Sequence, residues 1–210
     1  MNNETKQEVL RAYREDATVC VRCRSNDLIH RHQDGRWARP LFHEEGTCRS
    51  GVLFVFEAPN SGDTYDPNKG RMTCDLSTDL TGKFLFRLLT HIGLTPEDVL
   101  LTNSVLCLPR TEGYRVLPAQ RNACLYWLGR LIQDVNPGVV VTCGVKALEA
   151  IHILAQHGLE LSSSVGRLHP WYGRMLLPLY HPSPRGRITR SAEQQFSDIA
   201  ALIPYLKGTG

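Results

Sequence analysis

Residues 51–56 read GVLFVF, an apolar run of strand length that passes directly into the polar turn EAPNSGD at residues 57–63. Short continuous apolar runs bounded by turn residues are typical of strands that are buried on both faces of a sheet. Three further runs have the same character, at residues 99–106 (VLLTNSVL), 138–142 (GVVVT) and 175–180 (MLLPLY). We therefore predict a central sheet of four strands.

Helical patterns alternate with these strands. They cover residues 3–15, 84–92, 118–132 and 144–157, and Ser191-Ala-Glu-Gln194 is a capping box that starts another helix. Strands that alternate with helices form a largely parallel sheet with helices on both faces. The predicted fold class is α/β, a three-layer α/β/α sandwich with a central, mostly parallel four-stranded sheet.

We expect one domain over residues 1–210, with an irregular segment at 20–50 and an α/β core at 51–206. A chain of 210 residues that is 42% apolar can bury a full core. Its net charge of +3 permits a polyanionic partner without establishing one. No run of about 18 apolar residues is present and the first fifteen residues are polar, so we expect a soluble, intracellular protein that makes no membrane contact.

The chain has seven cysteines, an odd number, and a disulfide framework is not expected in a reducing compartment. Cys143 ends an apolar run and is predicted to be a core residue. Cys20-Val-Arg-Cys23 is a CxxC pair, which serves either as half of a metal site or as a redox pair. Cys48 and Cys74 have no partner at a recognisable spacing, so we assign them no role.

Polar side chains follow the predicted strands or interrupt them. Glu57 and Asp63 lie in the turn after the first strand, Asn103 lies inside the second, and His181 follows the fourth. Each could be structural, because turns favour acidic residues and buried amides and histidines often bond only to neighbouring backbone. Ligands of parallel sheets nevertheless bind at the carboxyl ends of the strands, where these four side chains should meet.

Three motifs together carry a resemblance to a known family. Glu-Ala-Pro at 57–59, Thr-Asn-Ser-Val at 102–105 and His-Pro-Ser-Pro at 181–184 resemble, in this order, the motifs of the uracil-DNA glycosylase superfamily. The resemblance extends from about residue 18 to the end of the chain. It implies a glycosylase that flips uracil out of DNA and hydrolyses its N-glycosidic bond, leaving an abasic site.

The cysteine spacing is similar to that of the iron–sulfur branch called family 4. The residues concerned are Cys20, Cys23, Cys107 and Cys124. Four thiolates can hold either a tetrahedral zinc ion or a four-iron cluster, and their number alone does not choose between them. The resemblance implies a [4Fe–4S] cluster with a structural role, which ties the segment 20–50 and the loop 107–124 to the sheet.

The resemblance also implies roles for the polar residues. Asn103 would read the O4 and N3–H groups of uracil, with Ala58 and Pro59 beside the base. His181 would donate a hydrogen bond to O2 of the leaving uracil, as an oxyanion hole does. A carboxylate would stabilise the sugar cation and orient the water. Glu57 and Asp63 both fit this last role, and we favour Glu57 because it directly follows the strand.

This chain departs from the family pattern in several places. Ala58 stands where the best-known branch has an aspartate, so another group must handle the water. Asn60 replaces a usual glycine, and Ser77 aligns with the aromatic residue that stacks on uracil, a role that Tyr65 could take over. Arg185 stands where the family often has a leucine that inserts into the base stack. The arginine makes such insertion a weaker expectation and adds a contact to phosphate.

The expected partner is uracil-containing DNA, single- or double-stranded, contacted by Ser183, Arg185 and Arg187. We expect a monomer in the cytoplasm, associated with the nucleoid if the source is bacterial. Two alternatives stay open: a glycosylase of the same fold that prefers hypoxanthine or xanthine, and a non-catalytic iron–sulfur module that binds nucleic acid. Some relatives trap the sugar covalently through a histidine in the loop between the last two cluster cysteines. That mechanism is excluded here, because residues 108–123 contain no histidine.

Overall fold

The computed structural model describes residues 3–24, 28–31, 35, 37–43, 46–59, 65–66, 71–72, 79–110 and 115–208. Asn60, Asp63, Cys74 and Ser77, which the sequence analysis named, lie outside the described residues. Tyr65 is described only as part of the backbone of a short strand.

The central sheet of the described chain has five strands in the order β5-β2-β6-β8-β7. Their bounds are β5 Leu100–Asn103, β2 Val52–Phe56, β6 Val139–Cys143, β8 Arg174–Leu179 and β7 His169–Trp171. The first four are mutually parallel and correspond to the four predicted strands. The prediction of a mostly parallel sheet is therefore confirmed.

The predicted number of four strands was wrong, because β7 adds a fifth strand at one edge. It pairs antiparallel with β8 in a hairpin. Its sequence, His169-Pro-Trp171, is short, polar at one end and interrupted by proline, so it carries no apolar run. Proline is tolerated there because an edge strand leaves one row of backbone groups without a ladder partner.

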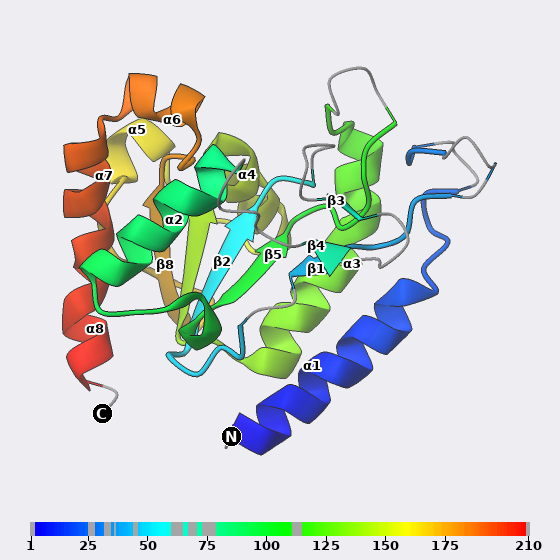
Figure 1. Ribbon diagram of the computed structural model, residues 1–210, viewed down its shortest axis with the longest axis horizontal. Helices are drawn as coiled ribbons and strands as arrows, with labels where there is room; N and C mark the ends of the chain where they lie inside the picture. The colour runs from blue at the N-terminus through cyan, green and yellow to red at the C-terminus, as the bar shows by residue number, and fades with distance from the viewer. Residues whose placement is uncertain are drawn as a thin grey trace.

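Helices cover both faces of the sheet, which confirms the three-layer α/β/α sandwich (Figure 1). Successive side chains of β2 point to opposite faces of the sheet, so they pack into two separate apolar clusters. Leu53 and Val55 belong to the first cluster, and Val52, Phe54 and Phe56 belong to the second. The first cluster packs on α1 (Asn3–Thr18), α3 (Pro118–Val135) and α4 (Val145–Leu154). The second packs on α2 (Leu80–His91), α7 (Ala192–Ile199) and α8 (Ile203–Gly208).

Local sequence signals start several of these helices. The predicted capping box is present at α7, where the Ser191 side chain accepts from the Gln194 N–H and the Gln194 side chain accepts from the Ser191 N–H. Pro118 occupies the first position of α3, where its missing N–H costs nothing. Asp79 caps α2 by accepting the Thr81 N–H at 2.9 Å. None of the helices among the described residues is long and apolar enough to cross a membrane.

The segment before β2 is tied to the chain that follows β5. His30 donates its backbone N–H to Leu108 O at 2.9 Å, and Leu41 donates to Leu106 O at 2.8 Å. A small second sheet orders β1 (Phe42–His43), β4 (Arg71–Met72) and β3 (Tyr65–Asp66). These contacts bring the neighbourhoods of Cys23 and Cys107 together, although 84 residues of sequence separate the two.

Candidate functional site

Three predicted site residues lie at the carboxyl edge of the sheet. Phe56 and Asn103 are register partners in β2 and β5, so Glu57 leaves the sheet beside Asn103. His181 follows β8, which is joined to β2 through β6. Figure 1 shows the carboxyl ends of these parallel strands at the same edge. The predicted convergence of these residues follows from this strand order.

The backbone of Glu57 is fixed by the start of the segment after β5. Its carbonyl oxygen accepts hydrogen bonds from the Val105 N–H at 2.9 Å and from the Ser104 hydroxyl at 2.8 Å. The Glu57 side chain is half-buried, and burial raises the pKa of its carboxyl above the usual value, although Arg121 and Lys146 act against that shift. The carboxylate is thus held beside two cations at a partly desolvated position.

These two cations belong to a small ion network between α3 and α4. Arg121 is buried, and its Nη1 lies 3.1 Å from Oε2 of Glu149. Lys146 Nζ lies 2.8 Å from Oε1 of the same glutamate. Glu149 therefore anchors both cations, and its own charge offsets part of their effect on the Glu57 carboxyl. Arg121 and Cys124 both belong to α3, so this helix carries one of the cations as well as one of the predicted cluster cysteines.

The environment of His181 defines which of its ring nitrogens carries the proton. The backbone N–H of Ser183 donates to Nδ1 at 3.2 Å. A backbone N–H can only donate, so Nδ1 is unprotonated and the neutral ring carries its proton on Nε2. Burial lowers the pKa of His181, and Asp79 opposes this shift in part. The ring also packs edge-on against Phe56, with centroids 5.6 Å apart. His181 is therefore a neutral donor through Nε2.

Two glycines allow the chain to close around His181. Gly144, which directly follows β6, has φ +96, a conformation that residues with a Cβ rarely adopt, and a Cβ there would be in ordinary contact with the His181 Cβ at 3.5 Å. A Cβ at Gly186 would overlap the carbonyl oxygen of His181. Ser183 caps the short helix α6 (Pro184–Thr189) by accepting the Gly186 N–H at 3.2 Å. The Pro-Ser-Pro turn and these contacts make a rigid support for the imidazole.

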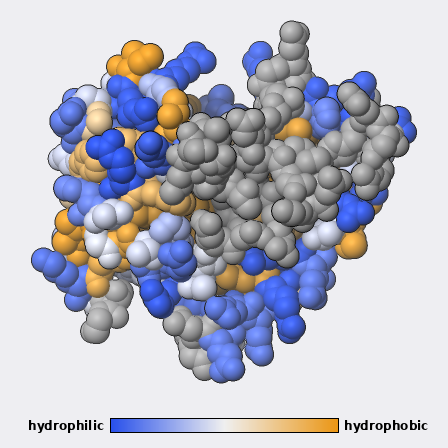
Figure 2. Space-filling model, in the orientation of Figure 1, coloured by the Kyte–Doolittle hydropathy of each residue, from blue (hydrophilic) through white to orange (hydrophobic). Residues whose placement is uncertain are grey.

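The two arginines that are predicted to contact DNA differ in their exposure and in their contacts with the rest of the protein. Arg185 is exposed on α6. Arg187 instead donates to Pro182 O at 2.9 Å and stacks over the Phe84 ring at 4.6 Å. Ile188 is 86% exposed, and the sequence analysis missed it. In Figure 2, a hydrophobic patch among hydrophilic residues lies where Figure 1 places α5 (Leu161–Ser164) and α6. The described surface beside His181 thus combines positive charge with an exposed apolar side chain.

The predicted base-binding residues line the same edge. Asn103 is 3% exposed. Pro59 is buried, and Ala58 packs against the first apolar cluster. The sequence analysis had also missed Ser104, Arg121 and Asp79. Ser104 could have been found from the polar run Thr-Asn-Ser within an apolar strand, whereas no local pattern marks Arg121 or Asp79.

The four predicted cluster cysteines lie on segments that the fold brings together. Cys23, Cys107 and Cys124 are buried and Cys20 is partly exposed. Burial, together with the nearby Cys23 and Cys20 thiols, raises the pKa of the Cys124 thiol to about 12. Burial also raises the pKa of Cys107 well above its ordinary value, with Cys124, Cys23 and Cys20 acting in the same direction. The four cysteines are therefore close enough to interact electrostatically.

Four cysteine thiolates can form two kinds of metal site, a single-ion site or a four-iron cluster. Within the described parts of the chain, no group of three or more His, Cys, Asp or Glu side chains is placed to hold one metal ion. In a four-iron cluster each thiolate binds a different iron, so the ligands need not converge on one point. Four thiols, three of them buried, fit such a cluster in number and in ligand type.

Two other cysteines lie away from this group. Cys143 is 3% exposed in β6, which confirms its prediction as a core residue, and burial raises the pKa of its thiol. Cys48 is fully buried, with Sγ 3.6 Å from Val52 O, and burial raises the pKa of its thiol to about 11. Both are packing residues in the described structure.

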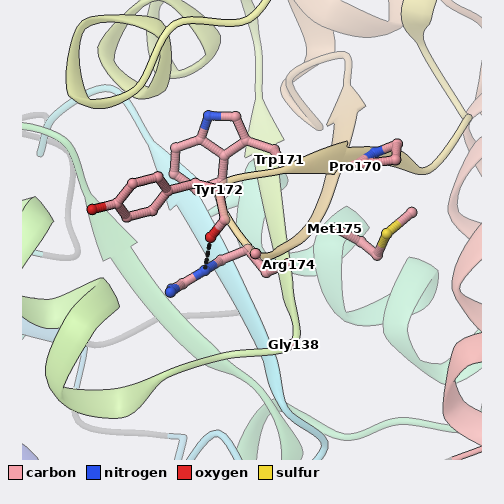
Figure 3. Close-up of a pocket in the computed structure, with 7 residues that line it drawn as sticks. Gly138, Pro170, Trp171, Tyr172, Arg174 and Met175 are labelled. Atoms are coloured by element: carbon pink, nitrogen blue, oxygen red, sulfur yellow. Dashed lines mark hydrogen bonds between the residues drawn. The ribbon is translucent and has the colours of Figure 1, made fainter.

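Two pockets among the described residues lie outside the predicted site. One, of about 530 Å³, lies at the β7–β8 hairpin, where Arg174 donates to Tyr172 O (Figure 3). This hairpin edge is separated from β2 by β6 and β8. The other, of about 480 Å³, extends from Arg121 and Glu149 along α4. Only the second adjoins the charged network beside Glu57.

Comparison with known proteins places the chain in a family. The family model described as the uracil DNA glycosylase superfamily matches residues 43–207. A type-4 uracil-DNA glycosylase of Thermotoga maritima is 27% identical over 213 aligned residues, which cover 98% of this chain and 99% of that protein. One of Saccharolobus solfataricus is 29% identical over 149 residues, 66% of this chain and 63% of that protein. One of Archaeoglobus fulgidus is 27% identical, over 75% of this chain and 79% of that protein. The chain therefore belongs to the uracil DNA glycosylase superfamily.

Proposed function

We propose that this protein is a DNA repair glycosylase that excises uracil by hydrolysing its N-glycosidic bond. The observation that carries the proposal is the hydrogen bond from the Ser183 N–H to Nδ1 of His181, from which a proton on Nε2 follows. Its Nδ1 accepts from the Ser183 N–H, so a neutral Nε2–H donor is held at the carboxyl edge beside Glu57 and Asn103. Such a donor would stabilise developing negative charge, and the Glu57 carboxylate at the same edge of the sheet would balance positive charge.

Cleavage of the bond leaves negative charge on the uracil and positive charge on the sugar. His181 would stabilise the uracil anion by donating from Nε2 to O2, because a preorganised donor costs no reorganisation during the reaction. Its lowered pKa keeps the ring neutral to lower pH than an ordinary histidine, so the Ser183 hydrogen bond and the Nε2 donor persist. The Glu57 carboxylate would stabilise the sugar cation and orient the attacking water.

Base selection would rest on Asn103. An enzyme that acts on a base in a duplex must first flip the nucleotide into a pocket. The amide of Asn103 supplies one acceptor and one donor group, which match N3–H and O4 of uracil. Ala58 and Pro59 add apolar surface at the same edge. A preference for hypoxanthine or xanthine is the alternative that a test of substrates must separate.

We also propose that Cys20, Cys23, Cys107 and Cys124 bind a [4Fe–4S] cluster. Its support is the shared environment of four thiols from three segments and the likeness to the type-4 proteins. When bound, the cluster would supply a cross-link between these segments and no group for the reaction. We further propose that the protein acts as a cytoplasmic monomer.

The function is tested by incubating the purified protein with single-stranded oligonucleotides that each contain one deaminated base. We expect abasic sites from uracil at a higher single-turnover rate than from hypoxanthine or xanthine. Faster release of hypoxanthine or xanthine would assign a different substrate. Binding without any cleavage would show a non-catalytic module. Duplex substrates, tested in parallel, give the strand preference.

The catalytic carboxylate is tested by comparing Glu57→Gln with Asp63→Asn. We expect Glu57→Gln to lower the single-turnover rate at least about tenfold, roughly 1.4 kcal/mol of barrier, because it removes the negative charge beside the sugar. The isosteric amide should preserve the backbone contacts with Ser104 and Val105. A slow Asp63→Asn variant beside a fully active Glu57→Gln variant would move the role to Asp63.

The path of the DNA is tested with Arg185→Ala. Since Arg185 is exposed whereas Arg187 is engaged with Pro182 and Phe84, we expect Arg185 to make the phosphate contact. Its loss should weaken binding similarly on all sequences and reduce the slope of log K against log salt by about one. Arg11→Ala, at an exposed position of α1 away from α6 (Figure 1), is the control with an equal charge change. An unchanged slope for Arg185→Ala would place the DNA elsewhere.

A further inference from the structure

A tryptophan on α3 points its only polar group at one of the four cysteines. The indole Nε1 of Trp127 lies 3.1 Å from Sγ of Cys20, although 107 residues of sequence separate the two. Indole N–H is a donor only, so the sulfur must be the acceptor. Trp127 is also three residues beyond Cys124, which places both on the same side of the helix. One helical turn thus contacts the group of cysteines through a sulfur and through an N–H.

The packing around Trp127 holds its ring in this orientation. Trp127 is 7% exposed and meets the ring of Tyr13 from α1 edge-on, with centroids 5.9 Å apart. Tyr13 in turn meets Phe42 edge-on at 6.0 Å. On the outer side, the Arg130 guanidinium lies 5.7 Å from the Trp127 ring centroid. A buried ring with neighbours on several sides cannot reorient its N–H without disrupting the packing of α1 on α3.

The acceptor of this bond is the most exposed of the four cysteines. Cys20 is partly exposed, whereas Cys23, Cys107 and Cys124 are each 5–6% exposed. Hydrogen bonds to the sulfurs and solvent exposure both tune an iron–sulfur cluster, because each affects the negative charge at the ligands. The single tryptophan donor is therefore placed at the ligand where water and small oxidants have the easiest access.

We propose that Trp127 is a positioning residue for the iron–sulfur cluster, whose indole N–H orients the Cys20 thiolate, raises the reduction potential of the cluster and slows its loss. The inference rests on the proposed [4Fe–4S] cluster and goes beyond it, since four cysteines alone would not require a donor. Donation to the thiolate withdraws charge from the ligand and so stabilises the reduced form, which carries one more electron.

The test compares Trp127→Phe with wild type and with a matched control. Phenylalanine keeps an aromatic ring against Tyr13 but lacks the N–H. Trp171→Phe removes an equivalent buried indole donor, because Trp171 is 5% exposed and donates to Ala155 O at 2.8 Å. Trp171 ends β7 at the hairpin with β8 (Figure 3), at the opposite edge of the sheet from β5, the strand that precedes Cys107. Iron and sulfide content, a redox titration and the rate of cluster loss to a chelator are measured for all three proteins.

We expect Trp127→Phe to shift the reduction potential to more negative values and to lose its cluster about tenfold faster, a typical effect of removing a partner of a metal ligand. Trp171→Phe should match wild type in both measurements. Wild-type potential and rate of loss in a Trp127→Phe protein with full iron content would overturn the inference. Wild-type protein purified with zinc or without sulfide would instead overturn the proposed cluster.

A second measurement needs no variant. With ¹⁵N-labelled tryptophan, the wild-type protein has three indole N–H groups, from Trp37, Trp127 and Trp171. A donor bonded to a cluster ligand should show a large paramagnetic shift that changes when the cluster is reduced. Three indole signals at ordinary positions in both redox states of the iron-loaded protein would contradict the proposed hydrogen bond, even if Trp127→Phe did not fold.

Discussion

Replacing His181 with alanine is expected to lower the single-turnover rate of uracil excision by about 10²–10³-fold, the usual effect of losing one donor aimed at developing charge. The affinity for uracil-containing DNA should fall much less, because the negative charge on the uracil develops as the bond breaks. The expectation rests on the Nε2–H donor of His181. The hydrogen bond from the Ser183 N–H to Nδ1 holds this donor in place. Rapid-quench single-turnover assays and equilibrium binding measure the two effects separately.

His91→Ala is the control for this variant. His91 is exposed near the end of α2, at the opposite end of that helix from Asp79, so it should retain the wild-type rate. A loss of affinity in His181→Ala that accounts for its whole loss of rate would give His181 a role in binding instead of in the chemical step.

Replacing Cys107 with alanine is expected to remove most of the iron and most of the soluble, folded protein. Cys107 lies between the segment that carries Cys23 and the helix that carries Cys124, and it packs with Cys23 and Ile29. Loss of one of four ligands would remove the cross-link among these parts of the chain and leave the backbone hydrogen bonds between the segment before β2 and the segment after β5. Metal binding is coupled to folding in such sites. Iron analysis, absorbance in the visible range and thermal unfolding measure the effect.

Cys143→Ala separates loss of the cluster from loss of a buried thiol. Cys143 is 3% exposed in β6 and belongs to the second apolar cluster, so its replacement should cost some stability and retain full iron. Soluble Cys107→Ala protein with wild-type activity and no iron would contradict a structural role for the cluster.

The elements of the core could be read from local sequence because their signals are local. The apolar run at residues 52–56 and the helical spacing after Pro118 each encode one element, and both correspond to elements of the structure. The strand β7 was missed because a short edge strand buries little and needs no apolar run. Glu57 and Asn103 could be placed together because parallel strands end at one edge, and their strands are paired in register.

Local sequence patterns were sufficient to predict the fold class, the polar residues that follow the strands and the family that the motifs resemble. The contacts that give single atoms their roles became visible only in the folded chain. The proton on His181 Nε2, the Ser104 bond to Glu57 and the Arg121 charge beside it arise from contacts between separate elements. The Trp127 bond to Cys20 is the extreme case, since no periodicity or spacing relates two residues 107 positions apart. Such contacts depend on how helices pack on a sheet, and packing is a property of the whole chain that local patterns do not encode.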